Sequence, residues 1–236
     1  MDVFGKALKD YYQGNRTNKL WLHNDYGEPE EMPLDIFFRQ GNDLPKLEQL
    51  ALNMCEGSIL DIGAGAGCHS LILQAKGFNV TALEISDPAC EIMRNRGIMK
   101  IINKDVLQYQ GEKFDTLLLL MNGIGLCEDL NGLHTFLQHM KKLSKPDSQL
   151  IFDSSDISYL YADHNMPRFK YYGEISYQYE YQNIKGNWFK WLFIDYTSLA
   201  EIAGENGWFC QLIYEDDMDQ YLVRLTLKDN SLVDPD

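Results

Sequence analysis

The chain has 236 residues, of which 35 are Asp or Glu and 21 are Lys or Arg, so its formal net charge at pH 7 is -14. A content of 45% hydrophobic and 24% charged residues is typical of a globular domain and excludes a disordered chain. Because binding to a nucleic acid backbone depends on clustered Lys and Arg, this charge also argues against nucleic acid as a partner.

The cysteines and the first residues predict a compartment. The five cysteines are widely spaced and form no Cys/His ligand cluster, so the sequence predicts neither a disulfide framework nor a bound metal. Residues 1–6 lack the basic and apolar regions of a signal peptide. The longest uninterrupted apolar run, residues 117–121, is far shorter than the roughly 20 residues that cross a bilayer. We therefore expect a cytoplasmic protein without a membrane partner.

Residues 1–57 are predicted to form an N-terminal helical cap. Helical patterns near 3–12 and 43–54 flank a polar segment, 28–33, whose composition is typical of a loop.

From residue 58 onward, short apolar runs alternate with helical periodicity, which is typical of a parallel sheet with crossover helices. The near-continuous apolar run at 116–120 is typical of a strand buried on both faces. The predicted strands are 58–62, 79–84, 98–103, 114–121 and 149–154, and the predicted helices are 70–76, 86–96 and 133–143.

The regular pattern stops after residue 155, where aromatic residues accumulate. Residues 159–196 hold 13 of the 29 aromatic residues, and apolar and polar residues alternate along 174–181. This alternation predicts an antiparallel hairpin with one covered face, with a turn near 183–187 and a returning strand at 188–194. A lid over a ligand, core packing and a contact with a second subunit all remain open for this insertion. A helix at 197–205 and strands at 208–214 and 221–227 complete the chain.

The most informative segment joins the first strand of the alternating region to its helix. Glycines at 63, 65 and 67 let the backbone turn tightly and approach a ligand closely, while the helix that follows directs unpaired N–H groups toward it. Glu84 ends the next strand, where an acidic side chain can accept hydrogen bonds from a ribose diol. Asp105 follows the third strand, where it could accept from an exocyclic amine.

The spacing of this loop separates two classes of cofactor. A dinucleotide fold requires G-x-G-x-x-G, and position 68 is Cys68 instead of glycine. Asp61 precedes the first glycine by two residues, and a carboxylate there is a poor neighbour for a pyrophosphate but a good one for an ammonium or sulfonium group. The sequence therefore favours a cationic cofactor.

On these residues, the stretch from Ile59 to about Asp156 resembles the core of class I S-adenosylmethionine-dependent methyltransferases, and 197–227 resembles the closing section of that fold. The resemblance implies an α/β, Rossmann-like fold with a seven-stranded, mostly parallel sheet in the order 3-2-1-4-5-7-6, the last strand antiparallel, and helices on both faces. An S-adenosylmethionine-binding methyltransferase domain would then span 58–236, with the aromatic-rich hairpin inserted at about 159–196.

The resemblance also implies a cofactor site. The glycine motif with Asp61 would contact the methionine portion, Glu84 the ribose hydroxyls, Asp105 and Val106 the adenine, and the residues after the fourth strand the methyl-donor cleft. The expected S-adenosyl-L-methionine site comprises Asp61, Gly63, Ala64, Gly65, Gly67, Glu84, Ile85, Asp105, Val106, Met121, Asn122 and Arg39.

Several side chains keep two interpretations. Arg39 could pair with the methionine carboxylate or end a solvated helix. His69 and His134 could each act as a general base, although a lone histidine is more often structural. Asn122 begins Asn-Gly-Ile-Gly where relatives that methylate bases carry D/N-P-P-Y/F, which argues against base methylation. Asp153, Ser154 and Asp156 end the fifth strand and could face the acceptor.

The sequence therefore predicts a methyltransferase that moves the methyl group of S-adenosylmethionine to a small-molecule acceptor in a closed cleft, as a monomer or homodimer. It identifies no catalytic base, and none is required if the acceptor atom has a free lone pair. A non-catalytic S-adenosylmethionine-binding protein on the same fold is the alternative. An NAD-dependent oxidoreductase is disfavoured by the residues at positions 61 and 68.

Overall fold

The larger of the two sheets in the computed structural model, which describes residues 1–162 and 166–228, carries the glycine loop. In spatial order its strands are β5 (Ile101–Asn103), β4 (Asn79–Glu84), β3 (Ser58–Ile62), β6 (Phe114–Leu119), β7 (Ser144–Ser155), β12 (Gln220–Leu227) and β11 (Trp208–Glu215). Numbered along the chain within this sheet, the order is 3-2-1-4-5-7-6, and β12 runs antiparallel to both neighbours. The predicted Rossmann-like arrangement is therefore confirmed.

Helices cover both faces of this sheet, because neighbouring residues of a strand point to opposite sides. Ile59 of β3 belongs to the same apolar cluster as Ala51, whereas Leu60 packs in the cluster that contains Leu137. One face carries α2 (Lys46–Met54), α3 (Cys68–Ala75) and α4 (Asp87–Asn95), and the other carries α5 (Leu130–Leu143) and α6 (Tyr196–Glu205). In the part of the chain that the structure describes, no helix has the length and apolarity to cross a membrane.

The helix ends follow local signals in the sequence. Gly77 and Gly97 adopt φ values of +88° and +90° just after α3 and α4, as the sequence predicted for helix-ending glycines. The Ser86 hydroxyl accepts from the N–H of Ala89 and caps α4. Single-turn 3-10 helices lie in the connections: η1 (Asp35–Phe38), η2 (Gly41–Asp43), η3 (Val106–Gln108), η4 (Gly123–Cys127) and η5 (Ser158–Tyr161).

Among the predicted strands of the larger sheet, those at 98–103 and 114–121 are longer than the observed ones. The strand predicted at 114–121 ends at Leu119, because Met121 and Asn122 both adopt positive φ values. The strand predicted at 98–103 is confined to β5.

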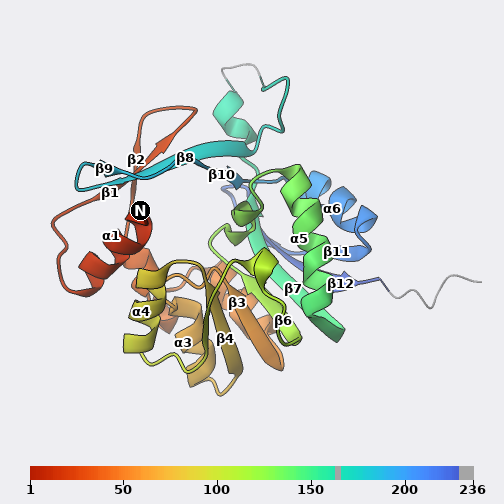
Figure 1. Cartoon of the computed structure of the whole chain (residues 1–236). Helices are drawn as coiled ribbons and strands as arrows, with labels where there is room; N and C mark the ends of the chain where they lie inside the picture. The colour runs from red at the N-terminus through yellow and green to blue at the C-terminus, as the bar shows by residue number, and fades with distance from the viewer. Residues whose placement is uncertain (163–165, 229–236) are drawn as a thin grey trace, which may run out of the picture.

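A second, antiparallel sheet lies above the larger sheet in Figure 1, and we call it the roof sheet. Its strands in order are β10 (Phe189–Leu192), β8 (Glu174–Tyr181), β1 (Leu20–Asn24) and β2 (Glu30–Met32), with β9 (Ile184–Lys185) paired to β8. The hairpin of β8 and β10 lies within the predicted insertion. Along β8, Tyr177 and Tyr181 are buried while Gln178 and Glu180 are only partly covered, so one face is covered as the alternation predicted.

The N-terminal segment departs from its prediction. It contains α1 (Val3–Tyr12) and α2, but the segment predicted as a loop at 28–33 forms β2 at residues 30–32, and β1 pairs with β8 from far along the chain. The predicted cap is thus helical only in part. A five-residue strand whose partner is remote in sequence leaves no local pattern strong enough to identify it.

Candidate functional site

The glycine loop connects β3 to α3 and exposes bare backbone at two of its three glycines. Gly63, Gly65 and Gly67 have φ values of +70°, +55° and +81°, which side chains rarely adopt. A Cβ at Gly63 would meet no atom within 4 Å, and one at Gly65 would meet only the Phe37 ring at 3.6 Å. A Cβ at Gly67 would overlap the side chain of Ile98. The first two glycines therefore leave room for a ligand, and the third is required for packing.

Glu84 binds the glycine loop directly. Its Oε2 accepts from the N–H of Gly65 and its Oε1 from the N–H of Ser86, both at 2.8 Å. Burial raises the pKa of this carboxyl, while the two backbone N–H groups act in the opposite direction. Each oxygen keeps a further lone pair, so the carboxylate can still accept from a diol. The sequence-predicted pair of loop and acid is thus in contact.

Exposed apolar side chains and a carboxylate lie together beyond Glu84. Ile85 is 68% exposed and Leu107 is 42% exposed, while Val106 is buried. Asp105 caps η3 by accepting from the N–H of Leu107 at 2.7 Å, and the Asn103 amide donates to the carbonyl of Ile85 at 3.0 Å, which ties the two strand ends together. An apolar surface beside a carboxylate suits a planar base that carries an amine.

Asp61 lies behind the loop. It is 2% exposed, and its Oδ2 accepts from the Ser70 hydroxyl at 2.6 Å, near the start of α3. Burial raises the pKa of Asp61, and the Ser70 hydrogen bonds oppose that rise. In this arrangement Asp61 supports the turn into α3, and a contact with a positive ligand group stays a prediction.

Arg39, Glu48 and His69 form a buried ionic cluster between the N-terminal segment and α3. The Arg39 guanidinium binds Oε1 of Glu48, and the His69 ring nitrogen Nε2 lies 2.7 Å from Oε2. Burial would raise the pKa of Glu48, but His69 and Arg39 hold it below its usual range. Cys68, beside the cluster, is buried and directs its thiol to the Arg39 carbonyl. His69 is thus held by a carboxylate, and Arg39 is paired rather than solvated.

The other histidine weighed as a base lies outside this region. His134 is on α5, and its Nδ1 lies 2.8 Å from the side-chain amide of Asn206. It lies on the face of the sheet that α5 and α6 cover, opposite the face that carries α3.

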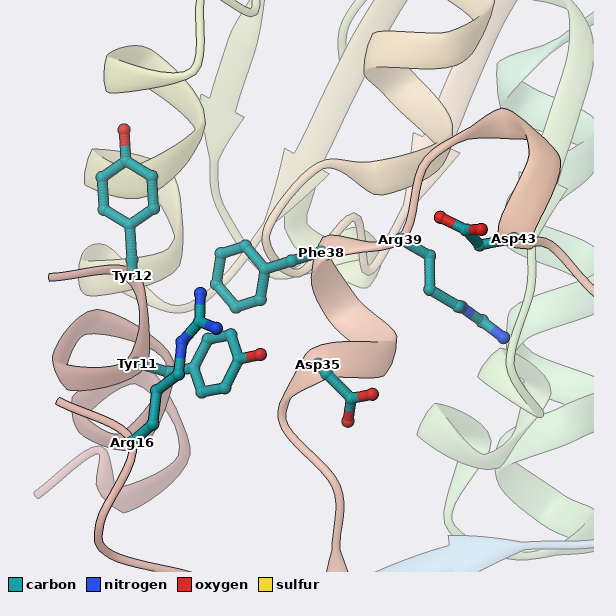
Figure 2. Close-up of a pocket in the computed structure, with 7 residues that line it drawn as sticks. All are labelled: Tyr11, Tyr12, Arg16, Asp35, Phe38, Arg39 and Asp43. Atoms are coloured by element: carbon teal, nitrogen blue, oxygen red, sulfur yellow. The ribbon is translucent and has the colours of Figure 1, made fainter. Parts of the chain in front are cut away.

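A cavity of about 650 Å³ lies against η1 (Figure 2), and none of the residues that line it belongs to the glycine loop. The Phe38 ring stacks on Tyr11 with centroids 5.1 Å apart, and the Arg16 guanidinium lies 4.7 Å from the Tyr11 ring centre. The lining residues are Tyr11, Tyr12, Arg16, Asp35, Phe38, Arg39 and Asp43. Arg39 is the only member of the expected cofactor site among them.

The chain after β6 forms a second exposed turn. Met121 and Asn122 have φ values of +64° and +53°, and both are partly exposed. The Asn122 N–H donates to Oδ2 of Asp153 at 2.9 Å, and the Ser155 hydroxyl donates to Oδ1 of Asn122 at 3.1 Å. The end of β7 thus holds this turn through both backbone and side chain.

The acids at the end of β7 divide into buried and accessible groups. Asp153 and Ser154 are 0% exposed, so the expectation that they could face an acceptor is wrong, because the turn after β6 and the strand β12 cover them. Asp156 is partly exposed and accepts from the Tyr172 hydroxyl at 2.7 Å.

Five aromatic rings from four segments form a continuous line, which we call the aromatic row. It begins at Phe37, which touches the glycine loop, and continues through Phe4, Tyr179 and Phe189 to Trp191. Successive ring centres are 5.1, 5.3, 5.0 and 6.3 Å apart. Its far end lies on η4, where the Trp191 indole fills the space that a Cβ on Gly125 would need.

The roof sheet is attached to the larger sheet at both ends. At one end α1, which contacts β8, packs on α4. Asp2, just before α1, accepts at 2.5 Å from the hydroxyl of Ser86, which lies two residues after Glu84. At the other end β10 lies on η4, and Lys190 pairs with Asp129 at 3.1 Å. The aromatic row therefore bridges from the glycine loop to the end of β6.

Sequence reasoning missed most members of this bridge. Phe4, Phe37 and Asp2 lie in the N-terminal segment, and nothing local to them signals a contact with a strand near residue 180. Only the alternating pattern around Tyr179 indicated a covered face.

Comparisons with known proteins give consistent results. Residues 38–212 match a family model described as a methyltransferase domain. The chain is similar to a SAM-dependent methyltransferase from Bacteroides fragilis, solved in complex with S-adenosyl-L-homocysteine, with 37% identity and a TM-score of 0.89. That match covers 96% of this chain and 95% of the other.

Two further relatives match a smaller share of the chain. The Type II methyltransferase M.NgoMIV from Neisseria gonorrhoeae is 38% identical over 95 residues, which are 39% of this chain and 28% of that protein. The chain thus matches less than a third of the length of this curated relative. CalS10, an amino pentose methyltransferase from Micromonospora echinaspora, shares 13% identity at a TM-score of 0.56 over 78% of this chain and 90% of its own, which is a likeness of fold alone.

Proposed function

The chain belongs to the methyltransferase domain family, among the S-adenosylmethionine-dependent methyltransferases, and we propose that it transfers the methyl group of S-adenosylmethionine to a small-molecule acceptor. When bound, the cofactor supplies a methyl group on a positively charged sulfur, which an atom with a free lone pair can accept.

The residues at the carboxyl ends of β3, β4 and β5 fit this cofactor. Gly63 and Gly65 leave space for close approach, and Glu84 keeps free lone pairs for the ribose hydroxyls. The exposed Ile85 beside Asp105 suits the adenine. We assign these four residues, with the Asp105 carboxylate, to cofactor binding.

Five other members of the expected cofactor site support the residues that would bind the cofactor. Asp61 and Gly67 shape the loop, Ala64 within the loop and Val106 after β5 are buried, and Arg39 is held by Glu48. Arg39 would have to leave that carboxylate, or bind through its remaining donors, to meet the methionine carboxylate.

The aromatic row is the observation that carries the proposed acceptor class. It runs from Phe37 at Gly65 to Trp191 at Gly125. Gly125 lies in η4, which follows the end of β6, where the methyl group would be presented. In the proposed function, a roof attached at both ends would enclose a small molecule, exclude water and hold two reactants in line, which lowers the barrier to transfer without a dedicated base. A duplex would require that roof to leave.

Charge and motif support the same choice. The net charge of -14 opposes a phosphate backbone, and Asn122 begins Asn-Gly-Ile-Gly in place of the base-methylation motif. M.NgoMIV is named as a Type II methyltransferase, so DNA is included as a test substrate. A protein that binds the cofactor without transfer is the remaining alternative.

A thermal shift assay tests the cofactor, and turnover tests the acceptor. Ligand at about 100 times its Kd adds roughly 2.7 kcal/mol, which corresponds to a rise in Tm of about 5–10 °C for a chain of this size. We expect this rise with S-adenosylmethionine and S-adenosylhomocysteine and no rise with NAD. Labelled methyl groups should then enter members of a metabolite panel. Incorporation into duplex DNA alone would overturn the small-molecule assignment.

A further inference from the structure

The turn at Met121 and Asn122 is energetically unfavourable by itself. Two consecutive non-glycine residues have left-handed φ values of +64° and +53°. Such a conformation is unfavourable for a residue with a side chain unless the surrounding structure imposes it. Something outside the turn must therefore hold it.

The Asn122 carbonyl accepts from the Gly125 N–H at 3.0 Å, and the N–H side of the turn is held by Asp153. Its Oδ2 accepts from the Asn122 N–H at 2.9 Å and from the Gln220 side-chain amide at 2.9 Å. The hydrogen bond from Ser155 reaches only the Asn122 side chain, so it does not determine the backbone angles. Asp153 lies one strand away from the turn, on β7, and is anchored there by strand pairing with β6 and β12.

Burying this carboxylate is unfavourable, because only one of its two oxygens is hydrogen-bonded among the described residues. Asp153 is 0% exposed, and its Oδ1 has no hydrogen-bond partner among the described residues. Burial raises the pKa of Asp153, and the Glu48 carboxylate raises it further. Glu48 itself is bound by Arg39 and His69. Groups that are expensive for stability and lie at a ligand-binding edge are candidates for a functional role.

We propose that Asp153 is a positioning residue that fixes the left-handed turn at Met121 and Asn122, and through it the wall of the methyl-donor cleft. This inference rests on the proposed function, because it assumes that the turn lines the cofactor. Asp153 itself does not touch the ligand, since it is completely covered.

Three variants separate positioning from a direct charge effect. Asp153→Ala removes the hydrogen bond to the turn, and we expect S-adenosylhomocysteine affinity to fall at least tenfold. Asp153→Asn keeps an acceptor oxygen, and affinity should stay within threefold of the wild type. Gln220→Ala, which removes the other donor to the same oxygen, serves as the control and should bind normally.

A ligand-free readout keeps the test independent of the proposed function. With methyl-¹³C methionine, the Met121 signal, assigned by Met121→Leu, should move in Asp153→Ala and stay in place in Asp153→Asn. An unmoved signal or unchanged affinity in Asp153→Ala would overturn the proposal. Equal losses in Asp153→Asn and Asp153→Ala would overturn it too, because the charge would then act on the ligand directly. If the wild type fails to bind S-adenosylhomocysteine while the Met121 signal behaves as described, the proposed function fails and the positioning of the turn stands.

Discussion

Trp191 of β10 lies against Gly125 of η4 so closely that its indole ring occupies the position of the missing side chain. Gly125 has no positive φ, so space for this ring is the reason that a glycine stands there. The contact joins the roof sheet to the end of β6 and closes one end of the aromatic row.

Gly125→Ala should therefore displace Trp191 and destabilise the fold. Overpacking of this kind costs typically about 1–3 kcal/mol, which we expect to lower Tm by several degrees, with a red shift of tryptophan emission as the indole becomes exposed. Gly27→Ala is a matched control, because a Cβ at Gly27 meets only the Asn24 side chain, at 3.9 Å. The cost of Gly125→Ala should largely disappear in a Trp191→Ala background. An equal cost in both backgrounds would show that the clash is not with the indole.

Glu84→Gln should weaken cofactor binding. The amide would direct its NH₂ group at one of two backbone donors, Gly65 or Ser86, which now both donate to the carboxylate. Hydrogen bonds to charged groups contribute about 1.5–3 kcal/mol, so we expect S-adenosylhomocysteine affinity measured by calorimetry to fall about 10- to 100-fold. Glu91→Gln, an exposed glutamate paired with Lys9, should bind as the wild type does. Equal affinities for the two variants would contradict the assignment of Glu84.

Phe37→Ala tests the contact between the aromatic row and the glycine loop. Phe37 lies 3.6 Å from the position of a Cβ on Gly65 and meets Phe4 edge to face. Its removal opens the space above the loop, so we expect weaker cofactor binding together with a loss of about 0.5–3 kcal/mol in the free energy of unfolding, because Phe37 is only partly buried. Phe169, which is 102% exposed, provides a control substitution to alanine that should change neither. Unaltered binding in Phe37→Ala would show that the aromatic row does not contribute to cofactor binding.

Stability should depend on pH through Asp153. Burial raises the pKa of this carboxyl from 3.8 to about 6, so the folded protein binds the proton more tightly than the unfolded chain does. The free energy of unfolding should therefore rise as pH falls from about 7 to about 4, by about 3 kcal/mol from this group alone.

The difference between the wild type and Asp153→Asn in urea denaturation isolates this contribution. The variant should be more stable than the wild type at pH 7.5 and lose that advantage at pH 4.5. A difference that does not change with pH would mean that Asp153 is already neutral at pH 7.5 or is not buried in solution.

Local chemistry in the sequence determined the cofactor end of the molecule. The bounds of β3 and β4 were predicted residue for residue, because short apolar runs and flanking glycines are signals within a few positions of one another. The contact between Glu84 and Gly65 follows from the same neighbourhood, since a strand end and the adjacent loop of a parallel sheet meet at one edge.

The tertiary structure alone decided what covers that edge. The pairing of β1 with β8, the aromatic row and the hold of Asp153 on Asn122 all join residues that are remote in sequence. The sequence placed Asp153 at a strand end but could not tell that the neighbouring turn would bury it. Such contacts depend on which strands become neighbours and which faces they turn inward, and this choice is made by the packing of the whole chain rather than by any local pattern.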